Sequence, residues 1–235
     1  MVRLCTFALV ASLSTSALAV ECAAPEGTTS QGLAAQSPEA RVAFLSKLLG
    51  EQSVAIQRWT LLWGAGYGLM TIGQLALMPL LPAHREDWVI GAASSAVGFA
   101  VVVIDPPEVL QGGPVFVERA RVVTPEQTCQ LLIDGERMLS AGAKKQAFST
   151  SWISHVVNVL FNVGVGLILG LGYDRWQTAA INGAVGIAIG EATTLTTPTG
   201  LIDGWERYRF GGKNDSKVTV RLVPAGIGAG LVLTF

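Results

Sequence analysis

The fold is decided by residues 152–195, which read WISHVVNVLFNVGVGLILGLGYDRWQTAAINGAVGIAIGEATTL. This stretch holds two apolar segments, Trp152–Gly172 and Trp176–Leu195, and each of them begins at a tryptophan. A short polar turn, Tyr173–Arg175, separates them. Tryptophan is enriched where a membrane span meets water, because its ring is apolar and its N–H needs a partner. The stretch therefore predicts a helical hairpin in or on a membrane.

The same pattern occurs earlier in the chain. Apolar segments cover Trp59–Leu81 and Trp88–Ile104, with the polar turn Pro82–Asp87 between them. The chain of 235 residues is 50% apolar and 14% charged, whereas globular proteins have about 25% charged residues. Four apolar segments in two pairs predict a mainly α fold with two membrane hairpins, 59–104 and 152–195.

Each of the four segments carries a stripe of small or polar residues at helical spacing. The stripes are Thr60, Gly64, Gly68 and Thr71; Gly91, Ser94, Ser95, Gly98 and Asp105; His155, Asn158, Asn162, Gly166 and Gly170; and Ala179, Asn182, Gly186, Gly190 and Thr193. Small residues let membrane helices approach closely where no hydrophobic force holds the helices together. We expect the two Gly-rich hairpins to pack through these stripes.

Small and large residues also alternate with a period of two, which is compatible with a second fold, a small outer-membrane β-barrel. Gly64, Gly66 and Gly68 alternate with larger residues, and the chain ends at Phe235. The last residues resemble the terminal strand of bacterial outer-membrane barrels, which commonly end in Phe. Barrel strands need only about 9–11 residues, so the apolar segments can also be divided into strands.

The first residues predict a secretory signal peptide at 1–19. Arg3 supplies the positive start, Leu4–Leu18 the apolar core, and Ala17–Ala19 the small-x-small cleavage site. An uncleaved anchor helix is the alternative. We therefore expect an exported protein in a membrane of a bacterial cell envelope, with the inner and outer membranes both open.

After cleavage two cysteines stay in the chain, Cys22 and Cys129. An oxidising compartment allows them to form a disulfide. The alternative is a buried free thiol at Cys129. The acidic Glu21 before Cys22 argues against a lipoprotein signal.

The rest of the chain divides into two units of similar order, which predicts a tandem duplication. Chance similarity between Gly-rich apolar segments is the alternative. A flexible leader at 20–36 is followed by unit 1 at 37–112, with an amphipathic helix from Ser37 and the hairpin 59–104. Unit 2 at 113–210 has a strand at Val115–Val123, an amphipathic helix from the capping box Thr124–Gln127, the hairpin 152–195 and an interfacial segment Trp205–Phe210. A C-terminal β-hairpin at 211–235 follows, with strands Lys217–Val223 and Gly230–Phe235.

The basic residues conflict with a simple inner-membrane topology. A cleaved signal places both hairpin turns in the cytoplasm, yet each turn has a single basic residue, Arg85 or Arg175. The segment 106–151, expected outside, has five Lys and Arg residues. The positive-inside rule favours the reverse.

The candidate polar intramembrane site consists of His155, Asn158, Asn162, Asn182 and Glu191. With the turn near residue 174, antiparallel helices place residue 155 opposite about residue 192. A carboxylate beside an imidazole can hold a proton or a cation, and ionisable groups at membrane depth are costly. The alternative is an ordinary hydrogen-bonded or solvated pair at the membrane interface.

Other chemistry finds little support in the sequence. There are two histidines and no Cys/His cluster with ligand spacing, so we expect no metal and no cofactor. No phosphate loop, dinucleotide fingerprint or nucleophile elbow is present. The formal charge of −1 argues against a nucleic-acid partner.

These patterns favour a non-enzymatic envelope protein that acts as a structural scaffold or accessory subunit. Its expected partners are the lipid bilayer and either a second copy of the chain or another envelope protein. A transport or ion-coupling protein, with the polar stripe between the hairpins, is the alternative function.

Overall fold

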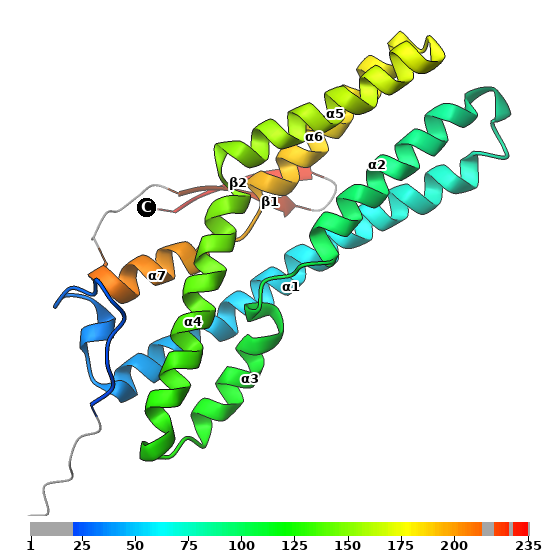
Figure 1. The fold of residues 1–235 in the computed structure, drawn as a ribbon. Helices are drawn as coiled ribbons and strands as arrows, with labels where there is room; N and C mark the ends of the chain where they lie inside the picture. Colours follow the sequence, from blue (N-terminus) through cyan, green and yellow to red (C-terminus); the bar gives the residue numbers. More distant parts are fainter. Residues whose placement is uncertain (1–20, 213–218, 226–227, 235) are drawn as a thin grey trace, which may run out of the picture.

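The computed structural model describes residues 21–212, 219–225 and 228–234, and it is mainly helical (Figure 1). The mainly α prediction is therefore confirmed, and the barrel alternative finds no support in these residues. The predicted signal peptide, 1–19, lies outside the described residues. The elements are η1 (Leu33–Ala35), α1 (Pro38–Leu77), η2 (Pro82–His84), α2 (Arg85–Val103), α3 (Val109–Arg121), α4 (Pro125–Ser149), α5 (Trp152–Tyr173), α6 (Trp176–Leu195), α7 (Gly200–Phe210), β1 (Thr219–Ala225) and β2 (Gly228–Thr234).

Helix α1 is a single element of 40 residues. It begins after Ser37, whose Oγ accepts a hydrogen bond from the backbone N–H of Ala40 at 3.4 Å. Its first half packs against α3 and α4, and its second half pairs with α2 (Figure 1). The amphipathic helix and the first apolar segment are thus continuous, whereas α4 and α5 are separate helices with a break at Thr150 and Ser151.

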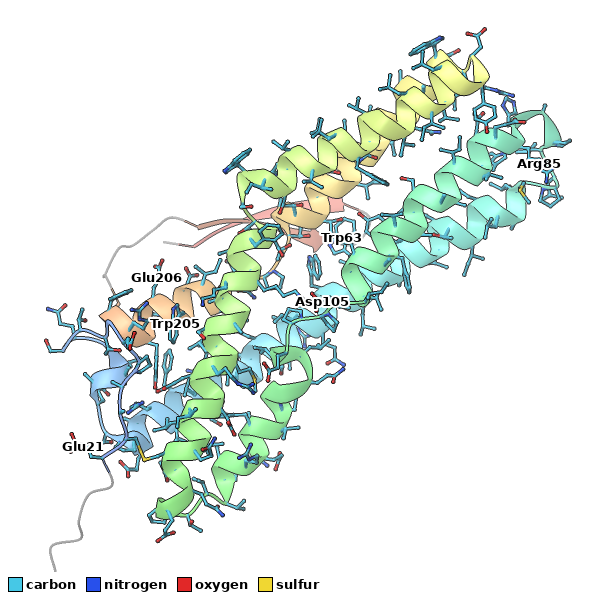
Figure 2. All side chains as sticks on the ribbon, viewed as in Figure 1. Glu21, Trp63, Arg85, Asp105, Trp205 and Glu206 are labelled. Atoms are coloured by element: carbon cyan, nitrogen blue, oxygen red, sulfur yellow. A yellow bond between two sulfur atoms is a disulfide. The ribbon has the colours of Figure 1, made fainter. Side chains whose placement is uncertain are left out.

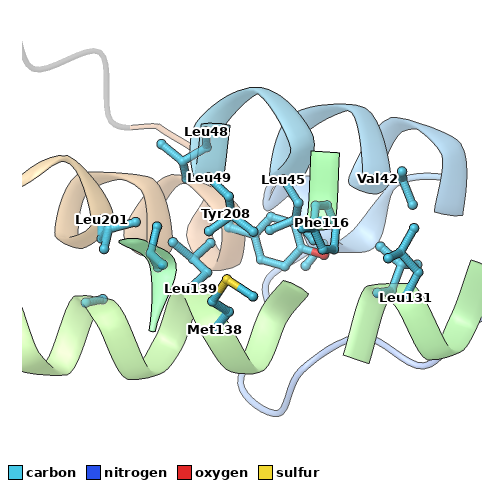
Figure 3. Close-up of a cluster of buried hydrophobic side chains, with 14 of the residues drawn as sticks. Val42, Leu45, Leu48, Leu49, Phe116, Leu131, Met138, Leu139, Leu201 and Tyr208 are labelled. Atoms are coloured by element: carbon cyan, nitrogen blue, oxygen red, sulfur yellow. The ribbon is translucent and has the colours of Figure 1, made fainter. Parts of the chain in front are cut away.

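The helical domain, which we define as residues 21–56, 109–149 and 200–210, encloses one hydrophobic core (Figure 3). Apolar side chains at helical spacing on α1 meet side chains from α3, α4 and α7. Its fully buried side chains include Leu45, Leu49, Val109, Leu131, Leu132, Leu139, Leu201 and Tyr208. At roughly 1.5–3 kcal/mol for each large apolar side chain removed from water, this core holds the domain together.

The strand predicted at Val115–Val123 is wrong, because these residues lie in α3 and in the turn after it. The buried residues Val109, Gly113 and Phe116 follow helical spacing and face α1. A Cβ on Gly113 would lie only 2.7 Å from the carbonyl oxygen of Leu49. This close approach between α3 and α1 outweighs the preference of β-branched residues for strands.

The described part of the predicted leader, from residue 21, is in contact with the helical domain. The backbone N–H of Thr29 donates to the carbonyl of Arg209 at 2.9 Å, and Ala34 of η1 is buried in the core. Helix α7 covers this leader, and its Tyr208 is buried in the core rather than placed at a surface. Strand β1 pairs antiparallel with β2, with Thr219 opposite Thr234.

The two helix pairs, α1–α2 and α5–α6, extend from the helical domain in the same general direction (Figure 1). Arg175 joins their tips, because its Nη1 donates to His84 Nδ1 at 2.9 Å and to Asp87 Oδ2 at 3.4 Å. Near the domain, Trp63 Nε1 donates to Thr196 Oγ1 at 2.9 Å. The pairs are therefore tied together at both ends.

Two stretches in the described part of the chain are long and apolar enough to cross a membrane, Pro82–Val103 and Trp152–Tyr173, each of 22 residues. The most apolar parts of these two stretches are only 22% and 17% buried within the protein. Neither helix α6 nor the second half of α1 is both long and apolar enough to be counted with them. Two of the four apolar segments thus have the composition of a span, and they belong to different pairs.

Candidate functional site

The polar stripe lies between α5 and α6, where the sequence places it. His155 is near the start of α5 and Glu191 is near the end of α6, so both are at the domain end of this pair. Nδ1 of His155 forms a hydrogen bond with Oε2 of Glu191. Both side chains are about one-third exposed, at 34% and 28%. The pair is accessible from outside the protein rather than enclosed.

Asparagines extend this pair along α5. Asn158 Nδ2 donates to Glu191 Oε1 at 2.8 Å and to the carbonyl of Ile187 at 3.1 Å. Asn162 Nδ2 donates to Asn158 Oδ1 at 2.9 Å. The side chains form one hydrogen-bonded chain that ends on the carboxylate, and each Glu191 oxygen has its own donor. This arrangement can hold a proton between the imidazole and the carboxylate.

Glycines of α6 make room for these asparagines. A Cβ on Gly190 would lie 2.0 Å from Asn158 Oδ1, and a Cβ on Gly186 would lie 1.9 Å from Asn162 Oδ1. The small residues on α6 therefore pack directly against the polar residues on α5. The sequence contains both stripes, and the register that pairs His155 with Glu191 also places Asn158 near Gly190 and Asn162 near Gly186.

Asn182 takes a different position from the other four residues. It lies nearer the tip of the pair, on α6, and lines the space toward α2. No hydrogen bond joins it to His155, Asn158, Asn162 or Glu191, all of which are in the described part of the chain. The candidate site is therefore the four-residue chain, without Asn182.

We expect Gly190→Ala to lower the free energy of unfolding by roughly 1–3 kcal/mol, because Asn158 must leave its place and Glu191 loses a donor. Thermal unfolding followed by circular dichroism in detergent measures this change. Gly164→Ala on α5 is the matched control, since a Cβ there meets nothing within 4 Å, and its effect should stay within about 0.5 kcal/mol. Equal effects of the two substitutions would contradict the contact.

A second polar cluster, which the sequence did not predict, lies in the helical domain. The Arg41 guanidinium, 1% exposed, binds Glu136 of α4, the hydroxyl of Tyr208 of α7, and the carbonyls of Cys22 and Ala23. Burial, together with the hydrogen bond to Glu136, raises the pKa of Tyr208 far above its usual range. The signal in the sequence is one charged residue at helical spacing from the apolar residues of each helix. Arg41 lies four residues before Leu45, and Glu136 lies three residues before Leu139.

The disulfide candidates meet beside this cluster. The structure joins Cys22 of the leader to Cys129 of α4 in a disulfide. With the Arg41 cluster, it fixes the leader to three helices. This second cluster is enclosed, so its evident role is to hold the helical domain together.

Comparison of the chain with protein-family models, with curated proteins and with solved structures found no match. Within the described residues no group of three or more His, Cys, Asp or Glu side chains could hold a metal ion.

Proposed function

We propose that this chain is a membrane-embedded envelope protein whose two helix pairs insert into a bilayer and whose helical domain stays in water. Its role is that of a structural scaffold or accessory subunit. The observation that carries the proposal is the outward exposure of the most apolar helices. In a soluble protein, helices of this composition are buried, and exposed apolar patches rarely exceed a few hundred Å².

The distribution of large side chains supports this proposal. Leu160, Leu167 and Leu171 on α5 are 65%, 46% and 73% exposed. Trp88 and Trp176 lie at the tips of the two pairs, and Trp63 and Trp152 lie at their domain ends. Helix α5, at about 1.5 Å per residue, is about 33 Å long, close to the roughly 30 Å of a hydrocarbon core. The aromatic residues would then mark both interfaces.

The experiment places the protein in phosphatidylcholine vesicles and extracts the vesicles with alkaline carbonate. We expect the protein to stay in the membrane pellet, and Leu160→Arg to reduce this retention, because an arginine at the centre of a span costs about 2.5–3.5 kcal/mol. Ile133→Arg is the matched control, since Ile133 is 57% exposed but lies on α4 in the helical domain. Release of the unmodified protein into the supernatant would contradict the proposal.

A second candidate function, ion coupling, is favoured by the hydrogen-bonded chain from Asn162 to Glu191. For this function Glu191→Gln should abolish proton flux into vesicles loaded with a pH-sensitive dye, while carbonate retention stays unchanged. The amide keeps the size of the carboxylate but cannot take up a proton. Glu206→Gln, on the exposed side of α7, is the control for loss of one carboxylate. No flux in the unmodified protein would leave the scaffold role alone.

A further inference from the structure

A cavity of about 520 Å³ lies between the two helix pairs. Its walls come from α1, α2, α5 and α6, and its domain end is formed by α4 and the segment between α2 and α3. Figure 2 shows Asp105 at the domain end of α2 and Arg85 at the opposite tip. The volume is within the range of about 300–1,000 Å³ that small-ligand pockets have. We infer that this cavity binds one linear acyl chain, with a carboxylate head at the domain end.

The walls suit an acyl chain. Their apolar side chains include Val97, Val165, Val185 and Ile189. Along α5 the lining residues extend from position 154 to position 165, which corresponds to about 17 Å of helix. An elongated apolar space of this kind is filled better by a flexible chain than by a compact ring.

Polar groups on the walls are largely bonded within the protein. Ser95 Oγ donates to Gln74 Oε1 at 3.2 Å, and Tyr67 OH and Thr193 Oγ1 are 3.0 Å apart. The amide nitrogen of Asn158 is held by Glu191 and Ile187. These groups leave the apolar side chains as the main contact for a ligand in the middle of the cavity.

The domain end has a different chemistry, since two hydrogen-bond donors are buried there. Trp59 Nε1 and Gln146 Nε2 have no partner among residues 21–212, and both side chains line the cavity. The amide of Gln146 is oriented by its other atom, because Oε1 accepts from the backbone N–H of Leu201 at 3.0 Å. Buried donors without an acceptor are costly, so a ligand head that displaces the atoms covering these two donors and supplies acceptor oxygens would stabilise this end.

Lys145 adds a positive charge to the same end. It lines the cavity and pairs with the Asp105 carboxylate at 2.6 Å. The Asp105 side chain is 87% exposed, and ion pairs at such positions contribute little. Lys145 can therefore turn toward a bound carboxylate. A carboxylate head would then pair its charge with Lys145 and offer acceptor oxygens to Trp59 Nε1 and Gln146 Nε2.

The test uses the full chain in phosphatidylcholine vesicles and an oleate analogue with a diazirine in its chain. After irradiation, mass spectrometry of peptides should place the cross-links on the lining parts of α2, α5 and α6. Excess oleate should compete with this labelling, whereas oleyl alcohol should compete roughly tenfold less, the equivalent of about 1.4 kcal/mol for the carboxylate contacts. Labelling that no excess of oleate reduces, or equal competition by the alcohol, would overturn the inference.

Variants make the test specific to the cavity. Val165→Trp should abolish the competed labelling by filling the space, whereas Val163→Trp should leave it unchanged, because Val163 is 45% exposed and does not line the cavity. Gln146→Glu keeps the acceptor for Leu201 but replaces the donor by an acid, so competition by oleate should weaken. Lys145→Ala removes the positive charge and should weaken it as well. Lys144→Ala, at an exposed position, is the control for Lys145→Ala and should leave the competition unchanged. Unchanged competition in both Gln146→Glu and Val165→Trp would place the ligand elsewhere and overturn the inference.

This inference does not require the helix pairs to cross a bilayer. Carbonate extraction of the same vesicles reports on insertion, and the cross-linking reports on the cavity. Failure of either one can therefore be told from failure of the other.

Discussion

Arg41→Met should lower the free energy of unfolding by roughly 3–5 kcal/mol, the range observed when one partner of a buried ion pair is removed. The methionine can fill much of the space, but Glu136 would be left as a buried carboxylate with only the Tyr208 hydroxyl as partner. The carbonyls of Cys22 and Ala23 would lose their donors as well. Chemical denaturation followed by circular dichroism measures the change.

Two further variants separate the charge from the packing. Arg119→Met removes an arginine from an exposed pair with Asp134, and it should cost no more than about 1 kcal/mol. Arg41→Met combined with Glu136→Leu should recover part of the loss, because no buried charge is then left unpaired. An Arg41→Met protein as stable as the Arg119→Met protein would show that the cluster does not hold the domain together.

The second large effect is expected from the disulfide. Cys22 and Cys129 are 107 residues apart in the chain. In the chain-entropy model, closing a loop of this length raises the free energy of the unfolded state by up to about 4.7 kcal/mol. The variant with Cys22→Ser and Cys129→Ser should therefore lose roughly 2–5 kcal/mol. It should also be cut faster by protease between residues 21 and 36, since the leader loses its covalent anchor.

Reductant provides the internal control for this prediction. Dithiothreitol should lower the unfolding midpoint of the unmodified protein and leave the double variant unchanged. Because Arg41 binds the carbonyl of Cys22 itself, the effects of Arg41→Met and of the cysteine substitutions should not be additive. A midpoint that reductant does not move would contradict a stabilising bridge.

Part of the fold could be predicted because it depends on local chemistry. Ser37 with Pro38 sets the start of α1, and tryptophans stand at the first positions of α5 and α6. The antiparallel register around Asp174 is enough to bring residue 155 to within one position of its partner on α6. These features need only helical periodicity and the position of a turn.

The rest depends on contacts between distant segments. The strand expected at Val115–Val123 followed residue preference, whereas α3 is set by the space that Gly113 leaves against α1. The leader is fixed by the Cys22–Cys129 bridge, which the sequence offered as one of two alternatives, and by Arg41. The composition of residues 20–36 contains no sign of the contact with Arg41. The cavity likewise exists only because two helix pairs, separated in sequence by α3 and α4, are tied together at both ends.

The continuity of α1 has a mechanical consequence. Its 40 residues form a rod of about 60 Å, about twice the thickness of a hydrocarbon core. One end carries Arg41 and the other end is the tip of a helix pair. With the pairs in a bilayer as proposed, a change in bilayer thickness would change the tilt of α1. Because α1 is continuous, the disulfide-bonded domain would rotate through the same angle. The orientation of the domain relative to the membrane would therefore depend on bilayer thickness.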